Sequence, residues 1–274
     1  MWNKTKELWN YFLFRLDPHR RLDAGWRDPL AELLGMLAPK RAEGIAKIRL
    51  GGPHDGGYVM LDDFREIGGA YSLGIGPDVS WDLALAQRGV PVWQYDPTVA
   101  GSPVSHPLFH FQPWRIGADP DPGTPTVSLA ALIDRNGHEG ADLILKMDIE
   151  GAEWGVLAGI DPERLKVFRQ ILIEFHSLNR VVEAEWRDRA TQALAHLTRF
   201  HEVVHVHGNN LSAIIVAGDL RITESLEVTL ARRDAYRFVA TEEMFPGPFD
   251  RANSRVFPDF PLGTFRFGPG ERRK

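Results

Sequence analysis

The sequence contains no cysteine, which excludes disulfide bonds and thiolate-bound metal ions. This absence fits a reducing compartment, and a cytoplasmic location is expected. The chain also lacks the basic excess of proteins that follow a polyphosphate backbone, since 32 Lys and Arg stand against 37 Asp and Glu, a net charge of −5. Nucleic acid is therefore not expected as a partner.

Long hydrophobic runs are missing too. No stretch reaches the ~20 apolar residues of a membrane span, and the N-terminal apolar patch is too short and too interrupted for a signal peptide. On a helix, Leu8, Phe12 and Leu16 would form one stripe with Trp9 beside it. We expect this stripe to pack on its own domain or on a second copy in a homodimer, with membrane-surface contact as the alternative.

The 274 residues suffice for one sizeable α/β domain with additions. We expect a helical N-terminal extension over 1–45, a main domain over 46–240, and a strap over 241–274. The strap is rich in Pro and Phe, and its five prolines from Phe245 onward disfavour regular structure.

Alternation of strands and helices begins at Ala70, after a strand–turn–strand passage in LGGPHDGGYVML. Short connections between the two kinds of element favour a parallel sheet covered on both faces, and sequence rich in β-formers after Phe200 favours a terminal antiparallel hairpin or meander. The expected strands are 70–75, 92–95, 108–111, 143–147 and 170–175, and the expected helices are 28–39, 79–88, 128–134, one from about 152, and 181–197.

The first candidate site is the turn YSLGIGPDVSWDL. Gly74 and Gly76 lie where a parallel strand passes into a helix, so the backbone can approach a ligand closely. The helix start suits a carboxylate or phosphate. Val79 replaces the third glycine of a dinucleotide fingerprint, which disfavours a nicotinamide cofactor. Glycines also tighten purely structural turns.

Asp96 is the second candidate, because it ends the next strand about twenty residues further on. A carboxylate at this place accepts the hydroxyls of an adenosine ribose. The alternative is a turn-forming role, since Asp before Pro97 commonly begins a turn.

The third candidate lies in ADLILKMDIEGAEWGVL, where Lys146, Asp148 and Glu150 alternate onto one face at the end of a buried strand. The carboxyl end of a parallel strand is where open α/β sheets bind ligands, and a row of charges is costly to keep there without use. The alternative is a structural Lys–carboxylate network in which Glu153 caps the next helix.

Two further motifs carry histidine. In QILIEFHSL, Glu174 and His176 share a face, and an imidazole titrating near neutrality suits removal of a hydroxyl proton. In HEVVHVHGNN, His205 and His207 share a face ahead of two asparagines, Asn209 and Asn210. Such a pair could chelate a metal together with Asp148 or His176, but scattered histidines on strands are more often structural, and we expect no metal.

LKMDIEGAEWGVL closely resembles the most distinctive motif of FkbM-type methyltransferases. The resemblance continues, in order, through DGGYVM, the glycine turn, the YDPT passage, WRIGA, IEFHSL and HVHGNN, and so covers roughly residues 46–230. It implies a Rossmann-like class I sheet and S-adenosylmethionine as methyl donor. The implied acceptor is a hydroxyl on a sugar or other small secondary metabolite.

The resemblance also implies roles for particular residues, with one departure. Many class I methyltransferases place an acid just before the glycine turn, where this chain has Ser72; Asp78, Asp55 or Asp148 would then hold the methionine amino group. His176 is the expected catalytic base, with Asp148 as competitor. The expected cofactor-binding residues are Asp55, Tyr58, Gly74, Ile75, Gly76, Asp78, Asp96, Pro97, Ile116, Gly117 and Asp148.

The sequence therefore predicts an S-adenosylmethionine-dependent O-methyltransferase with a small-molecule or saccharide acceptor. Two alternatives stay open: a nicotinamide-dependent oxidoreductase on a similar sheet, and a non-catalytic adenosine-binding or scaffold protein.

Overall fold

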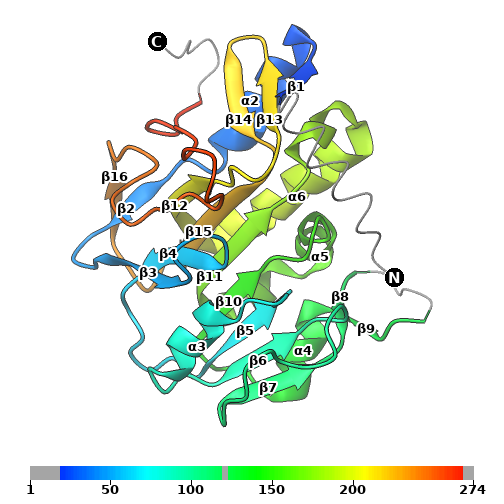
Figure 1. Cartoon of the computed structure of the whole chain (residues 1–274), viewed down its shortest axis with the longest axis vertical. Helices are drawn as coiled ribbons and strands as arrows, with labels where there is room; N and C mark the ends of the chain where they lie inside the picture. The colour runs from blue at the N-terminus through cyan, green and yellow to red at the C-terminus, as the bar shows by residue number, and fades with distance from the viewer. Residues whose placement is uncertain (1–18, 119–122, 268–274) are drawn as a thin grey trace.

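A seven-stranded sheet forms the centre of the computed structural model, which describes residues 19–118 and 123–267 (Figure 1). Strand β15 runs antiparallel to both of its neighbours, and all other neighbouring strands are parallel. In sheet order the strands are β12 (His201–Gly208), β15 (Leu226–Arg232), β11 (Phe168–Phe175), β10 (Leu143–Met147), β5 (Gly69–Leu73), β6 (Val92–Tyr95) and β7 (Phe109–Gln112).

The central strands β5, β10 and β11 are buried along their whole length, and their mostly apolar sequences suit a sheet covered on both faces. Alternate side chains enter different cores. Leu145 and Ile171 join the larger core, whereas Ile144 and Leu172 join the smaller one on the other face. The predicted mostly parallel α/β sheet is confirmed.

Helices cover the two faces unequally (Figure 1). The larger core receives side chains from four helices and the smaller core from α3 together with the hairpin of β3 and β4. The elements are α2 (Arg27–Gly35), α4 (Leu129–Asn136), α5 (Glu153–Gly159), α6 (Ala184–Phe200), α3 (Ser80–Ala86), β3 (Lys47–Gly51) and β4 (Gly57–Leu61). Short 3-10 helices are η1 (Ala24–Trp26), η2 (Pro162–Val167) and η3 (Leu178–Val182).

From residue 19 on, the N-terminal segment is less helical than the sequence predicts. Strand β1 (His19–Leu22) pairs in parallel with β13 (Ile214–Ala217), and β2 (Lys40–Ala42) pairs with β16 (Phe238–Ala240). Local periodicity cannot reveal these pairings, because each partner lies almost 200 residues away. The predicted stripe of Leu8, Phe12 and Leu16 lies outside the described residues, and the proposed division into three segments stays a prediction.

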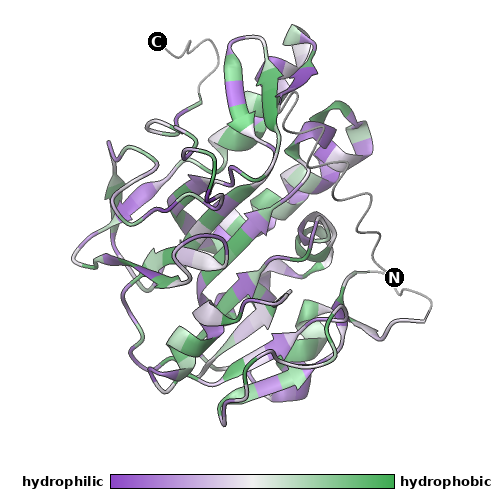
Figure 2. Cartoon of the chain, viewed as in Figure 1, coloured by the Kyte–Doolittle hydropathy of each residue, from purple (hydrophilic) through white to green (hydrophobic). Residues whose placement is uncertain are grey.

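The chain between β12 and β15 also differs from a simple hairpin. Residues 214–223 leave the main sheet as β13 and β14 (Leu220–Thr223), which form a separate three-stranded sheet with β1. Figure 2 shows β13 as a largely green, apolar strand. The remaining pair is β8 (Arg115–Ile116) with β9 (Thr126–Val127).

The C-terminal strap, defined here as residues 245–267, contains neither helix nor strand, as its prolines predict. Phe245 pairs with Gly263 in an isolated bridge, and Phe245, Leu262 and Phe265 are buried in the larger core. Among the residues that the structure describes, no helix is long and apolar enough to cross a membrane.

Candidate active site

The glycine turn and the β10 acid row meet at the carboxyl edge of the sheet. Gly74 and Gly76 have φ values of 76° and 53°, which favour glycine. A Cβ on Gly74 would lie 1.8 Å from the carbonyl oxygen of Asp148, whereas a Cβ on Gly76 would meet nothing within 4 Å. Lys146 Nζ donates to the Gly74 carbonyl at 2.6 Å. The turn is thus built against the end of β10, and its outer part is open.

Asp96 fastens the glycine turn to the end of β6. Its Oδ2 accepts hydrogen bonds from the backbone N–H groups of Ile75 and Gly76, both at 2.9 Å. Its Oδ1 accepts from the backbone and the hydroxyl of Thr98, at 2.7 and 2.6 Å. Asp96 is 4% exposed. A ribose hydroxyl would have to replace one of these donors, and Thr98, which sequence reasoning did not name, is the replaceable one because it lies on the exposed side.

The acid row after β10 is ordered by neighbouring elements. Tyr58, from β4, donates its hydroxyl to Asp148 Oδ2 at 3.0 Å, and Lys146 Nζ lies 4.0 Å from the same oxygen. Glu150 is 81% exposed and has φ 58°, a conformation that non-glycine residues adopt mainly where a structure holds them in it. Glu153 Oε1 accepts from the backbone N–H groups of Ile149 and Gly151, so it holds this turn.

His176 lies beside this row, as the adjacency of β10 and β11 predicts. Its Nδ1 lies 3.1 Å from Glu153 Oε1, and Nε2 lies 3.5 Å from Glu174 Oε1 and 3.8 Å from Asp148 Oδ1. The indole of Trp154 donates to the His176 carbonyl at 2.7 Å.

The charge state of His176 differs from the one that sequence reasoning assumed. Burial disfavours the imidazolium, but the hydrogen bond to Glu153 and the charges of Glu174, Glu153 and Asp148 outweigh burial and raise the His176 pKa to about 10. At neutral pH the imidazole in this environment therefore holds its proton. A resting general base at His176 is not favoured.

A second group of polar residues completes the cluster around Glu174. Asn209 donates to Glu174 Oε1 at 2.7 Å. Asn253, from the strap, donates to Glu227 Oε1 at 2.6 Å and to Asp55 Oδ1 at 3.3 Å. Sequence reasoning missed Glu227 and Asn253. The one sequence signal for either residue was Glu227, an acid between apolar residues near the start of the strand LEVTLAR.

Burial near other carboxylates changes the protonation of the cluster. The pKa of Glu174 is raised well above its usual value, first by burial and then by the charge of Asp148. Burial likewise raises the pKa of the Tyr58 hydroxyl, so the phenol stays a hydrogen-bond donor to Asp148. The site therefore gathers several acidic groups where burial and mutual repulsion disfavour their charged forms.

The His205 and His207 pair borders the cluster at Glu227 and otherwise contacts the strap. His205 Nε2 lies 2.8 Å from Asp250 Oδ1, and His207 bridges Glu227 Oε2 at 3.0 Å and Asp259 Oδ1 at 2.9 Å. Both imidazoles are buried. They fasten the strap to β12, in keeping with the structural interpretation of the motif.

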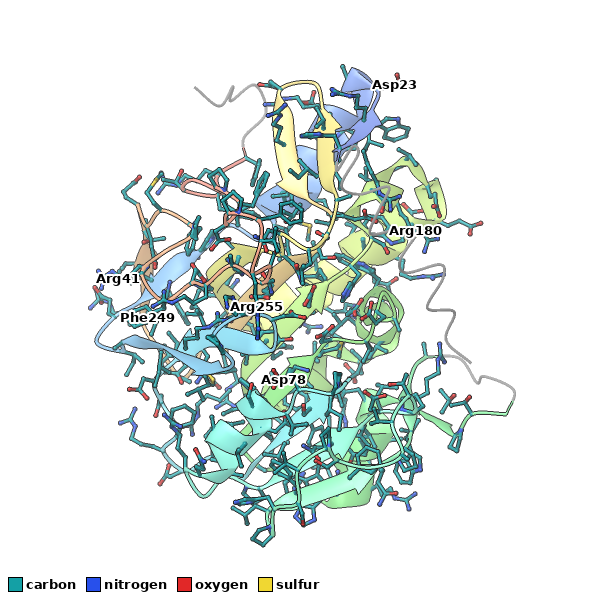
Figure 3. The ribbon with its side chains drawn as sticks, viewed as in Figure 1. Asp23, Arg41, Asp78, Arg180, Phe249 and Arg255 are labelled. Carbon is teal, nitrogen blue, oxygen red and sulfur yellow. The ribbon has the colours of Figure 1, made fainter. Side chains whose placement is uncertain are left out.

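The other predicted cofactor residues are placed in three different ways. Asp78 is exposed where α3 begins, and it accepts a hydrogen bond from the backbone of Ser80 (Figure 3). Pro97 is exposed just beyond Asp96. Ile116 is 3% exposed and packs in the larger core, with Gly117 following it at the end of β8. Contact of Ile116 and Gly117 with adenine stays a prediction, and the core position of Ile116 does not favour it.

A surface cavity of about 600 Å³ lies at the opposite, amino edge of the sheet. Its charged residues pair with one another: Arg169 with Asp142 and with Asp63, and Arg232 with Asp142. Ligands of open α/β sheets bind outside the carboxyl ends of the strands, so this cavity is not the candidate active site.

Part of this chain is similar to known proteins. Residues 97–203 match the family described as Methyltransferase FkbM domain. "Probable methyltransferase-like protein 24" of Rattus norvegicus is 33% identical over 120 residues, and the Homo sapiens protein of the same name is 32% identical over 120 residues.

Each match covers 39% of this chain and 32% of the relative, so the similarity spans about a third of the length of these curated proteins. The family match includes Asp148, Glu174 and His176, whereas Gly74, Gly76 and Asp96 precede it. Together with the strand order and the motif after β10, the match shows that residues 97–203 of this chain are similar to an FkbM methyltransferase domain.

Proposed function

We propose that the chain transfers the methyl group of S-adenosylmethionine to a hydroxyl oxygen of a small, saccharide-like acceptor. The observation that carries this proposal is the direct packing of the glycine turn on the acid row. Gly74 touches the Asp148 backbone, and Asp96 holds the next two backbone N–H groups of the turn. A ligand on the turn is therefore adjacent to Asp148.

The residues at the edge fit such a cofactor. The space beside Gly76 is open, so a nucleoside can approach the backbone there. Asp96 and Thr98 offer the carboxylate and hydroxyl that a ribose requires, and Asp148 offers a carboxylate for the methionine end. S-adenosylmethionine supplies an already activated methyl group, so the protein mainly provides geometry and a dry pocket.

The cluster beyond Asp148 supports a hydroxyl-rich acceptor. Carboxylates and amide oxygens accept hydrogen bonds from hydroxyl groups, and this cluster contains Asp55, Asp148, Glu174 and Glu227 within a network of two asparagine amides. An acidic acceptor would be repelled by the same charges. A neutral polyol or saccharide fits best.

Asp148 and His176 are the proposed catalytic residues. Asp148 Oδ1 and His176 Nε2 lie 3.8 Å apart, and both side chains are partly exposed, at 25% and 15%. An acceptor hydroxyl between them would pass its proton to Asp148, because His176 already holds a proton at neutral pH. The acceptor oxygen would then bond to the methyl carbon, and S-adenosylhomocysteine would leave. Tyr58 and Trp154 hold the two residues in place through the hydrogen bonds to Asp148 and to the His176 backbone.

Calorimetry with S-adenosylmethionine and with NAD tests the cofactor directly. Saturable binding of S-adenosylmethionine alone is expected, because Val79 occupies the place of a third glycine. Binding of NAD alone would favour the oxidoreductase. Transfer of labelled methyl from S-adenosylmethionine to a panel of saccharides is then expected, and cofactor binding with no transfer to hydroxyl, amine or carboxylate acceptors would favour a scaffold protein.

A further inference from the structure

Three side chains at the carboxyl edge form a set of nitrogen and oxygen atoms suited to a cation. One ligand atom each from Asp148, Glu174 and His176 lies within 4.8 Å of the others. We propose that these three residues bind a divalent transition-metal ion. The proposal reverses the expectation, drawn from the sequence, that the protein holds no metal.

The orientation of His176 is the first argument. Metal-binding histidines usually donate their second ring N–H to a carboxylate, which fixes the ring. Glu153 is fully buried and accepts at Oε1 from His176 Nδ1 at 3.1 Å. Nε2 then faces Glu174 and Asp148 at 3.5 and 3.8 Å, which is too long for good hydrogen bonds. Metal bonds of about 2.0–2.2 Å separate neighbouring ligand atoms by roughly 3.0–3.6 Å, so a small inward movement suffices.

The state of Glu174 is the second argument. Its side chain is 5% exposed, and Asn209 donates to Oε1. Its charged partner is the His176 imidazole, which also faces Asp148 and Glu153, so one positive charge is shared among three carboxylates. A buried carboxylate normally has hydrogen bonds or a charged partner, because burial without them is costly. A divalent cation held between Glu174, Asp148 and His176 would supply more positive charge to these carboxylates than the single imidazole does.

Neighbouring residues give a third and independent argument. Glu174 also lies within 4.8 Å of Asp55 and Glu227 through one ligand atom each. Asn253, 3% exposed, donates to both of these carboxylates, while its own Oδ1 is buried without a hydrogen-bond partner. This Asn253 oxygen could accept a hydrogen bond from a water molecule bound to the ion. The whole cluster thus has more acceptors and more negative charge than its protein donors satisfy.

The ligand types indicate which ions fit. A site with one imidazole and two carboxylates suits Mn²⁺, Fe²⁺ or Zn²⁺, whereas Mg²⁺ and Ca²⁺ prefer oxygen alone. Metal binding itself needs no methyltransferase activity. The function of the ion rests on the proposed function: it would orient the acceptor hydroxyl and lower its pKa, so that the hydroxyl loses its proton more easily.

Mn²⁺ titration of the EDTA-treated full chain tests the site, because bound Mn²⁺ loses its sharp six-line electron paramagnetic resonance spectrum. We expect one bound Mn²⁺ per chain. Glu174→Gln and His176→Gln should each weaken binding at least tenfold. The matched controls His110→Gln and Glu139→Gln change exposed residues outside the cluster and should bind Mn²⁺ as the original chain does.

Two results would overturn the proposal. In the first, adding the original chain leaves the six-line spectrum of millimolar Mn²⁺ undiminished. In the second, Glu174→Gln and His176→Gln each still bind one Mn²⁺ per chain as the original chain does. Melting temperatures accompany every titration. Asp148→Asn, at a partly exposed position, replaces any cluster variant that does not fold and should show the same loss. Calorimetry with S-adenosylmethionine on the same samples separates the two proposals. Mn²⁺ binding without S-adenosylmethionine binding would contradict only the proposed methyl donor. S-adenosylmethionine binding without Mn²⁺ binding would contradict only the proposed metal site.

Discussion

Alanine at Gly74 and alanine at Gly76 should damage the protein in different ways. Both positions have positive φ, so each substitution costs about 1–2 kcal/mol in backbone conformation. At Gly74 the new methyl group would also lie 1.8 Å from the Asp148 carbonyl oxygen. Relief requires the ends of β5 and β10 to separate, and overpacking of this kind typically costs a further 1–3 kcal/mol. We therefore expect a loss of about 2–5 kcal/mol for Gly74→Ala and about 1–2 kcal/mol for Gly76→Ala.

Cofactor affinity should follow a different order. The methyl group of Gly76→Ala would enter the open space where the nucleoside is proposed to lie. Urea unfolding followed by circular dichroism gives the stability of each variant, and calorimetry gives its affinity for S-adenosylmethionine. Gly76→Ala should lose at least tenfold in affinity while remaining the more stable variant. Equal stability losses would refute the packing argument, and unchanged affinity in folded Gly76→Ala would place the cofactor elsewhere.

Three other changes test separate parts of the structure. Asp96→Ala removes four hydrogen bonds that shape the glycine turn, so calorimetry should show S-adenosylmethionine affinity at least tenfold weaker; Asp78→Ala, at an exposed residue, should weaken it less. Trp154→Phe removes the donor to the His176 carbonyl, so turnover should fall more than cofactor affinity does, and equal falls would contradict a positioning role. Burial lowers the His201 pKa to about 4, so the unfolded chain binds more protons between pH 4 and about 6.5. The free energy of unfolding should therefore be highest above that pH range and should fall by up to about 3 kcal/mol as the pH drops through it. In His201→Gln this dependence of stability on pH should be weaker.

Much of the main sheet was predictable because its strands are short apolar runs between turn signals. The strands at 92–95 and 143–147 were predicted with the bounds that the structure has, and the helix after Ser128 begins where the Ser128 side chain accepts from the Ala131 backbone. Parallel strands bring their carboxyl ends to one edge, so the meeting of Asp148 with His176 followed from the strand order alone.

The rest depended on contacts between distant segments. Glu227 reaches the site because β15 inserts between β11 and β12, and Asn253 reaches it because the strap crosses the same edge (Figure 1). Neither position has a local signature. The pKa of His176 was equally inaccessible, since it reflects the sum of carboxylates from separate segments of the chain.

The insertion of β15 has a consequence for the order in which the chain can fold. During synthesis β11 and β12 both emerge before the strand that must lie between them. Until residue 232 is available, β11 keeps an open edge, and an unpaired edge strand can pair with another chain. A fragment limited to residues 97–203 would have the same defect permanently, and it would also lack β5 from the middle of the sheet. The segment most recognisable in sequence is therefore not a unit that can fold by itself.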